Sequence, residues 1–257
     1  MRFAPRTIVI TGASSGLGAE LARQYAGQGI CLGLLGRDEG RLEAVAQDCR
    51  VQGATVETGS IDVRDAESMR AWLLAFDQAH PVDLVIANAG ISAGLGEFGE
   101  GETQVRQIFA VNIDGVIHTV WPLVPRMISR KAGQIAIMSS LAGIRALPSA
   151  PAYSASKACV RYYGEALRGQ VKRYGVHVSV ICPGFIDTPL TRVNSFPMPF
   201  LMHEKDAAQR IIRALSCGKR RICFPKRLYY PLYFASLFSP SVTDSLFDAM
   251  PAKPHIS

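Results

Sequence analysis

Short apolar runs alternate along the chain with longer stretches in which apolar residues recur every three or four positions. The first run is residues 7–10, and the stretch after it places Leu21, Ala22 and Tyr25 on one helical face. Apolar runs that alternate with amphipathic segments predict parallel strands joined by crossover helices. We therefore expect an α/β fold, a single doubly wound, Rossmann-type parallel sheet with helices on both faces.

The same pattern places the remaining elements. No internal repeat, low-complexity tract or linker interrupts it, which predicts one dinucleotide-binding catalytic domain over residues 1–257. Prolines 122 and 125 should interrupt the longest helix. We expect further strands at about 30–35, 56–60, 82–87, 134–139, 176–182 and 221–225, and helices at about 66–79, 102–130, 153–174 and 204–216.

A glycine-rich turn follows the first strand directly. Gly12, Gly16 and Gly18 would allow a tight turn, close approach of a phosphate, and close packing of helix on strand. A helix that begins at such a turn points the positive end of its dipole at the phosphates. This strand–turn–helix context predicts a dinucleotide site that includes the intervening residues Ser14, Ser15 and Leu17.

The end of the second strand bears on which dinucleotide binds. There Gly36 precedes Arg37, whose guanidinium would bind a 2′-phosphate, so we expect NADP(H) to be favoured over NAD(H). Asp38 leaves the alternative open, because a carboxylate there could instead accept the ribose hydroxyl.

Three later residues suggest proton-transfer chemistry. Tyr153 and Lys157 stand four residues apart, on one face of the predicted helix, and Ser140 lies thirteen residues before the tyrosine. A phenol ordinarily has a pKa of about 10. We expect the lysine ammonium to lower the pKa of Tyr153, so that Tyr153 acts as acid and base while Ser140 holds the reacting oxygen. The alternative for such a pair is ordinary surface packing.

In order and spacing, these motifs resemble those of the short-chain dehydrogenase/reductase family over about residues 6–190. At one position the chain departs from many NADP-preferring members, because Ser15 stands where they carry a basic residue. Arg37 therefore supports the NADP(H) prediction nearly alone. The matching segments are Thr11-Gly12-x-x-x-Gly16-x-Gly18, Asn88-Ala89-Gly90, Asn112, Ser140, Tyr153-x-x-x-Lys157 and Pro183-Gly184.

The resemblance implies a role for each residue. Tyr153 would be the proton donor and acceptor, Ser140 would orient the substrate carbonyl, and Lys157 would bind the nicotinamide ribose. Asn112 would hold a water that links Lys157 to solvent. It also implies a homodimer or homotetramer formed through the helices near 102–130 and 153–174. The implied cofactor contacts are Asp62 and Val63 near the adenine, Asn88, Ala89 and Gly90 beside the central strand, and Ile186 and Thr188, after Pro183 and Gly184, at the nicotinamide carboxamide.

Composition narrows the remaining functional classes. The formal net charge is +7, but no nucleic-acid-binding module accompanies it, so we expect no nucleic-acid partner. Six cysteines and five histidines show no metal-ligand spacing, so we expect no metal. Reduced cysteines and a start without a signal peptide predict a cytoplasmic protein. We also expect no apolar stretch long enough to span a membrane.

Two carboxy-terminal segments have an unusual composition. Residues 185–203 form a proline-punctuated, Met-rich segment that we interpret as a lid over an apolar substrate, or as simple packing. The tail, residues 219–257, begins with basic residues and continues through an aromatic stretch to residue 238. This tail could cover the active site or a neighbouring subunit, and segment 219–238 could alternatively contact a membrane surface peripherally.

The sequence therefore predicts an oxidoreductase that transfers hydride between NADP(H) and a carbonyl or secondary alcohol, with an apolar small-molecule substrate. Two alternatives stay open. One is an NAD-dependent alcohol dehydrogenase of the same fold, and the other is a non-catalytic dinucleotide-sensing or scaffold protein.

Overall fold

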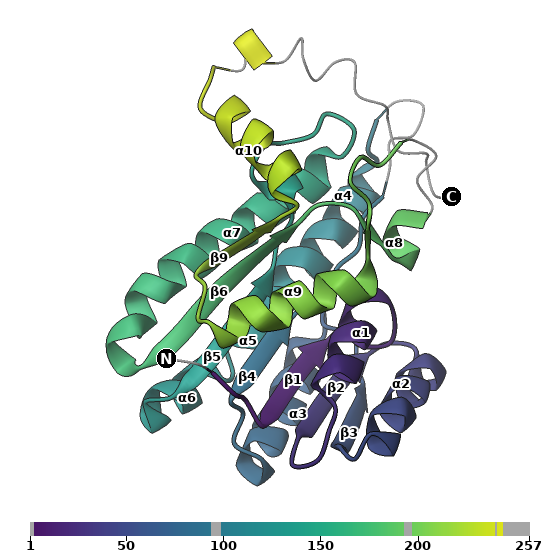
Figure 1. The fold of residues 1–257 in the computed structure, drawn as a ribbon, viewed down its shortest axis with the longest axis vertical. Helices are drawn as coiled ribbons and strands as arrows, with labels where there is room; N and C mark the ends of the chain where they lie inside the picture. The colour runs from purple at the N-terminus through teal and green to yellow at the C-terminus, as the bar shows by residue number, and fades with distance from the viewer. Residues whose placement is uncertain (1–2, 94–98, 193–196, 240, 244–257) are drawn as a thin grey trace.

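The computed structural model describes residues 3–93, 99–192, 197–239 and 241–243. Its centre is a seven-stranded parallel sheet of strand order β3-β2-β1-β4-β5-β6-β9 (Figure 1). The prediction of a doubly wound sheet is confirmed. The strands are β1 (Thr7–Thr11), β2 (Cys31–Gly36), β3 (Thr55–Ser60), β4 (Leu84–Ala87), β5 (Gly133–Met138), β6 (Val176–Pro183) and β9 (Arg221–Phe224).

Helices cover both faces of the sheet and form a separate core on each. Most positions of the central strands are buried on both sides, which is why these strands read as continuous apolar runs. One core lies beneath α1 (Gly16–Tyr25), α2 (Glu39–Val51) and α9 (Glu204–Ser216). The opposite core lies beneath α3 (Ala66–Ala79), α5 (Gly115–Val120), α6 (Val124–Arg130) and α7 (Pro151–Val171).

The helix predicted over 102–130 is present but is not uniformly α-helical. It comprises α4 (Glu102–Phe109), a π-helical turn (Ala110–Asp114), α5 and α6, with a turn between the last two. By length and composition this helix could cross a membrane, whereas the sequence analysis expects no apolar stretch of that length. However, 56% of its most apolar window is buried inside the protein, because it packs against the sheet and α3. Its apolar character is thus explained by the core.

The carboxy-terminal segments contain elements that the sequence did not predict. Within 185–203, the strands β7 (Ile186–Asp187) and β8 (Met202–His203) pair in parallel, and α8 (Pro189–Arg192) follows β7. Residues 193–196 of the predicted lid lie outside the described residues. The aromatic stretch forms helix α10 (Lys226–Ala235) directly after β9. Residue 240 and residues 244–257 of the predicted tail also lie outside the described part.

Candidate active site

The glycine turn after β1 is packed too tightly for larger residues. Gly12 has a φ of +67°, and a Cβ there would lie 2.8 Å from the Ala89 Cα atom. A Cβ on Gly18 would lie 2.2 Å from the Gly12 carbonyl oxygen. The turn, helix α1 and the end of β4 are therefore in backbone contact, as the glycine pattern predicts.

The amino terminus of α1 offers unpaired backbone donors to a ligand. Ser15 is its N-cap residue, yet the serine side chain makes no capping hydrogen bond, and the first turn contains no acidic residue. Free N–H groups and the positive end of a helix dipole suit the pyrophosphate of a dinucleotide.

A cavity of about 400 Å³ runs along the carboxyl ends of the strands, in front of this helix terminus. Every residue predicted to contact the cofactor lines it, from Gly12 to Thr188, and Ser140 lines it too. Asn112 does not. The cavity lies where the chain switches from β1 to β4, the place where doubly wound sheets bind ligands. Sequence reasoning missed other lining residues, among them Arg41, Ile91 and Thr191.

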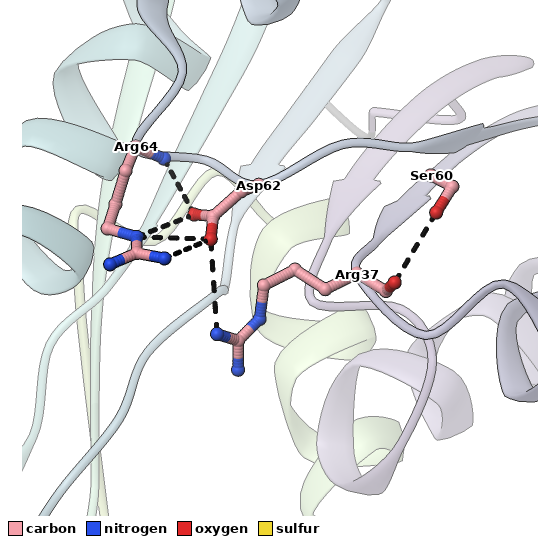
Figure 2. A network of polar contacts seen from close by, with 4 residues as sticks. All are labelled: Arg37, Ser60, Asp62 and Arg64. Carbon is pink, nitrogen blue, oxygen red and sulfur yellow. Dashed lines mark hydrogen bonds and ion pairs between the residues drawn. The ribbon is translucent and has the colours of Figure 1, made fainter.

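One end of this cavity is bordered by charged side chains. The Asp62 carboxylate accepts hydrogen bonds from the backbone and guanidinium of Arg64, at 2.7–3.1 Å (Figure 2). These bonds hold the pKa of the Asp62 carboxyl below its ordinary value. A guanidinium nitrogen of Arg37 lies 3.9 Å from the same carboxylate, and the Arg37 side chain is 63% exposed. Arg37 therefore reaches across this end of the cavity from the end of β2.

Asp38 is the residue that left the choice between NADP(H) and NAD(H) open, and it is engaged in the helix that follows it. It caps α2, because its carboxylate accepts a hydrogen bond of 2.9 Å from the backbone N–H of Arg41. The same carboxylate lies 3.0 Å from the Arg41 guanidinium. Arg41 is thus a second exposed cation beside Arg37. Arg41 lies in the first turn of α2, and this turn directly follows the second strand. That position in the sequence could have identified Arg41 as a cofactor-site residue.

At the middle of the cavity, Asn88 joins two central strands. Its side-chain amide donates to the carbonyl oxygens of Thr11 and Gly12, at 3.1 and 3.3 Å. Its backbone N–H donates to the Thr11 hydroxyl. Asn88 thereby holds the ends of β1 and β4 together beside the predicted cofactor site.

Ser140, Tyr153 and Lys157 meet at the other end of the cavity. Ser140 follows β5, and the other two side chains come from adjacent turns of α7. The Ser140 hydroxyl and the Tyr153 phenol both line the cavity, and the Ser140 oxygen accepts a hydrogen bond of 3.2 Å from the Ala142 backbone N–H. The Lys157 ammonium is almost fully buried, donates to the Met138 carbonyl at 3.0 Å and lies 5.7 Å from the Tyr153 ring centroid. The neighbouring Ser139 instead donates to the Lys157 carbonyl at 2.7 Å, which fixes α7 against β5.

The expectation that Lys157 lowers the pKa of Tyr153 is wrong for the protein chain itself. Burial raises the pKa of Tyr153, and the nearby Ser140 hydroxyl opposes this change only in part. Burial also lowers the pKa of Lys157 to about 8. Both groups lose hydration in the same pocket, so the chain on its own keeps the phenol protonated.

Asn112 lies in the π-helical turn and is fully buried. Its side-chain oxygen accepts from the Ile91 backbone N–H at 2.8 Å, while its nitrogen donates to the Ile91 carbonyl and to the Ser156 hydroxyl. A Cβ on Gly90 would lie 3.2 Å from both Asn112 Oδ1 and Lys157 Nζ, so the two side chains flank this glycine. The water that Asn112 would hold stays a prediction.

A second, smaller cavity adjoins the first at Ser140 and Tyr153. It measures about 170 Å³, and apolar side chains form most of its wall. Phe185, Leu190, Pro197 and Pro199 come from the predicted lid, and Leu228 and Leu232 come from α10. Among the described residues, the lid and the tail therefore both contribute to this cavity, which favours the interpretation that they cover the site.

The chain shows clear similarity to known proteins. The family model described as short chain dehydrogenase matches residues 6–196. An uncharacterized oxidoreductase of Myxococcus xanthus is 38% identical over 245 residues, which are 95% of either chain. A short chain dehydrogenase/reductase of Burkholderia phymatum, solved with NAD, superimposes with a TM-score of 0.81 at 26% identity over the whole of both chains. A Sphingobium yanoikuyae short-chain dehydrogenase, solved with NADPH, gives 0.80 at 21% identity over 98% of both chains.

Proposed function

Because this chain belongs to the short-chain dehydrogenase/reductase family, and is an NAD(P)-dependent oxidoreductase acting on CH–OH and C=O groups, we propose that it uses NADP(H) and acts on an apolar carbonyl compound. The observation that carries this proposal is the position of Ser140 and Tyr153, which line both cavities. A carbonyl held there would face the dinucleotide site on one side and apolar walls on the other.

In this proposal, the side chains of the chain bind the substrate oxygen and move one proton. In the reductive direction the Ser140 and Tyr153 hydroxyls donate hydrogen bonds to the carbonyl oxygen, which stabilise the negative charge that develops on it. Tyr153 then transfers its proton to that oxygen. The raised pKa of Tyr153 suits a group that must be protonated before it donates.

The residues around the larger cavity fit a dinucleotide. When bound, NADP(H) would supply the hydride and, in its oxidised form, a positively charged ring. The first turn of α1 would hold the pyrophosphate, and Lys157 would hold ribose hydroxyls with the ammonium donors that it does not use on Met138. The same ammonium would favour the Tyr153 phenolate left after proton transfer.

The preference for NADP(H) rests on the two arginines at the adenosine end. Arg37 and Arg41 are exposed by 63% and 68% and are held only by surface ion pairs, so both can turn towards a 2′-phosphate at little cost. Asp38 caps α2 through the backbone N–H of Arg41, so one of its carboxylate oxygens is engaged in the helix even when the Arg41 side chain turns away.

Turnover with a panel of ketones and aldehydes tests the proposed chemistry. NADPH oxidation should fall by about 10²-fold or more in Tyr153→Phe, because the variant lacks the proton donor. NADPH binding, measured by fluorescence titration, should change little. Tyr162→Phe is a matched control, since Tyr162 lies on the same helix, is 64% exposed and should keep full activity. Retention of most activity in Tyr153→Phe would exclude the assigned role.

A second experiment tests the cofactor preference. Arg37→Ala and Arg41→Ala should each raise the KM for NADPH and leave the KM for NADH nearly unchanged, because only NADPH carries the 2′-phosphate. We expect about a tenfold effect when both arginines are removed. Arg106→Ala, an exposed arginine on α4, should leave both constants unchanged. An enzyme that prefers NADH before any substitution would instead support the NAD-dependent alternative.

The proposal includes a homo-oligomer through the helices near 102–130 and 153–174. These helices expose Ile117, Trp121 and Tyr162 by 37%, 49% and 64%. Apolar side chains at this exposure suit a contact between copies. Light scattering of the purified chain would measure its size, and Trp121→Glu should reduce it if this face is the contact.

A further inference from the structure

Helix α10 presents apolar side chains on two opposite faces. Its inner face packs on the small core of Leu141, Val180, Cys182 and Cys223, with Leu232 only 8% exposed. Leu228 and Leu232 line the smaller cavity from this face. One side of the helix is therefore part of the proposed substrate site.

The outer face of α10 and the turn after it is exposed and apolar. Residues 230, 233, 234 and 237 follow the i, i+3, i+4, i+7 spacing of a single helical face. Among the described residues nothing covers their side chains, which point away from the core that the inner face contacts, so a further surface would be needed to bury them. The exposed fractions are 51% for Tyr230, 37% for Tyr233, 57% for Phe234, 64% for Leu237 and 60% for the adjoining Phe238.

Positive charge accompanies this face. Residues 207–243 contain seven Lys or Arg residues and no Asp or Glu, which equals the net charge of +7 of the whole chain. Lys226 and Arg227 are exposed at the start of α10, and the Lys226 ammonium lies 5.0 Å from the Tyr229 ring centroid. Tyrosine beside lysine and arginine is typical of segments that lie at a membrane–water interface.

The basic cluster that the sequence suggests over 219–227 is, however, divided by strand β9. Lys219 and Arg220 precede the strand, whereas Lys226 and Arg227 follow it, so the two pairs lie at opposite ends of β9, which Figure 1 shows running up to α10. Arg221, within the strand, forms an ion pair with Glu165 at 2.6 Å. Within the described part of this cluster, Lys226 and Arg227 are therefore the pair that adjoins the apolar outer face.

We infer that the outer face of α10, defined by Tyr230, Tyr233, Phe234, Leu237 and Phe238, binds an anionic lipid surface with Lys226 and Arg227 at the headgroups. Apolar substrate would then enter the smaller cavity from the lipid side of the same helix. Entry of substrate from the lipid rests on the proposed function, whereas lipid binding does not.

A lipid surface fits this face better than a second copy of the chain. Across a two-fold contact, the outer face of α10 would meet its own counterpart. Residues 207–243 provide no carboxylate to pair with the approaching Lys226 and Arg227, so the contact would bring like charges together. Anionic headgroups supply the missing negative charge, and aromatic rings and leucine can enter the boundary of the acyl chains.

Vesicle sedimentation tests lipid binding with the full chain. We expect binding to vesicles of equal parts phosphatidylserine and phosphatidylcholine, and weaker binding to phosphatidylcholine alone. Phe234→Glu with Leu237→Glu should lower the partition coefficient by about tenfold or more, because two apolar contacts are replaced by charges. Val51→Glu is the matched control, because Val51 is 78% exposed on α2 and should not affect binding.

A pair of charge variants tests the orientation of the helix on the lipid. Lys226→Glu with Arg227→Glu should weaken binding to phosphatidylserine vesicles by at least about fivefold per residue at low salt. Lys219→Glu with Arg220→Glu makes the same change in net charge at the other end of β9 and should have a much smaller effect. Equal losses in the two double variants would mean that only the overall charge matters, which would overturn the inference.

Two further results would overturn the inference that the outer face of α10 binds lipid. One is equal recovery of the unaltered chain in the lipid-free fraction with both vesicle types. The other is a size by light scattering that drops in Phe234→Glu with Leu237→Glu while lipid binding is absent, which would show a second copy on this face. NADPH turnover of a small water-soluble ketone should persist in these variants. Absence of lipid binding by the unaltered chain, with its turnover intact, would reject the inference alone, whereas absent turnover in the unaltered chain would reject the proposed function.

Discussion

At the scale of single residues, burial explains the pKa values of Tyr153 and Lys157 better than their spacing in the sequence does. The sequence places Tyr153 and Lys157 on one helical face, and the structure keeps them 5.7 Å apart from ring centroid to ammonium. Spacing cannot reveal that both groups are also withdrawn from water. The buried ammonium has its pKa lowered to about 8, and the phenol has its pKa raised. We therefore expect the lysine to be the group that loses a charge near pH 8.

This assignment predicts the pH dependence of reduction. As the pH rises through about 8, Lys157 loses its proton and with it the charge that favours the phenolate and binds the ribose. The kcat/KM for NADPH should therefore fall on the alkaline side of about pH 8, while Tyr153 is still protonated. Initial rates measured at limiting NADPH across the pH range would show this fall.

The variant Lys157→Arg tests whether Lys157, and not another group, causes the fall in kcat/KM near pH 8. A guanidinium keeps its proton throughout this pH range, so the variant should be less active overall because of its size but should show no fall near pH 8. An unchanged alkaline limb in Lys157→Arg would assign the titration to another group and contradict the prediction.

At the scale of elements, sequence pattern predicts regular segments well and local departures poorly. Helices α3 and α9 begin and end at the residues that the pattern indicates, because their apolar spacing and flanking residues are regular. The π-helical turn at Ala110–Asp114 leaves no mark in the apolar spacing, yet it places the Asn112 amide against Ile91 and Ser156. These contacts join residues far apart in the sequence, which a local pattern cannot contain.

A buried ion cluster between elements was likewise missed. The Asp77 side chain, fully buried at the end of α3, lies 2.9 Å from Arg126 and 2.8 Å from Arg130 of α6. It also accepts a hydrogen bond from the Val82 backbone N–H. The partners stand about fifty positions along the chain from the aspartate, so only the fold brings them together. The cluster fastens α3 and α6 beside the start of β4.

Replacing this carboxylate should destabilise the fold. Asp77→Asn removes the charge that pairs both arginines, and we expect the free energy of unfolding to fall by about 2–3 kcal/mol, since the arginines are partly solvated. Asp48→Asn, which removes a surface pair with Arg23, should cost less than about 1 kcal/mol. Urea denaturation at neutral pH would measure both changes, and an equal cost would contradict the structural role given to Asp77.

The pH dependence of this effect has a definite sign. Burial raises the pKa of the Asp77 carboxyl, but the bonds from Arg130, Val82 and Arg126 outweigh burial and hold the pKa below its ordinary value. A carboxyl with a lowered pKa contributes stability above its unfolded pKa of about 4, and this contribution is lost as the pH falls. The stability difference between Asp77→Asn and the unaltered chain should therefore shrink below about pH 4.

At the scale of the whole molecule, the amino-terminal part follows the family pattern and the carboxy-terminal part determines what is specific to this chain. Much of the lining of the larger cavity could be predicted, from the glycine turn and from the family resemblance, although Arg41, Ile91 and Thr191 were missed. The smaller, proposed substrate cavity could not be predicted, since its wall combines the region after β5, the predicted lid and α10. No local pattern indicates which of these distant segments come together.

The size of the substrate should therefore depend on α10. Leu232 is 8% exposed and lines the smaller cavity, so Leu232→Trp would fill part of its volume of about 170 Å³. We expect the KM for long apolar ketones to rise by about tenfold, as the loss of apolar contact implies, and the KM for a small ketone to change by less than about twofold. Tyr230→Trp, on the outer face, enlarges a side chain on the same helix and should leave both constants unchanged. Steady-state kinetics at saturating NADPH would compare the three chains. If Leu232→Trp affected long and small ketones equally, α10 would not shape the part of the site that holds the remote end of the substrate.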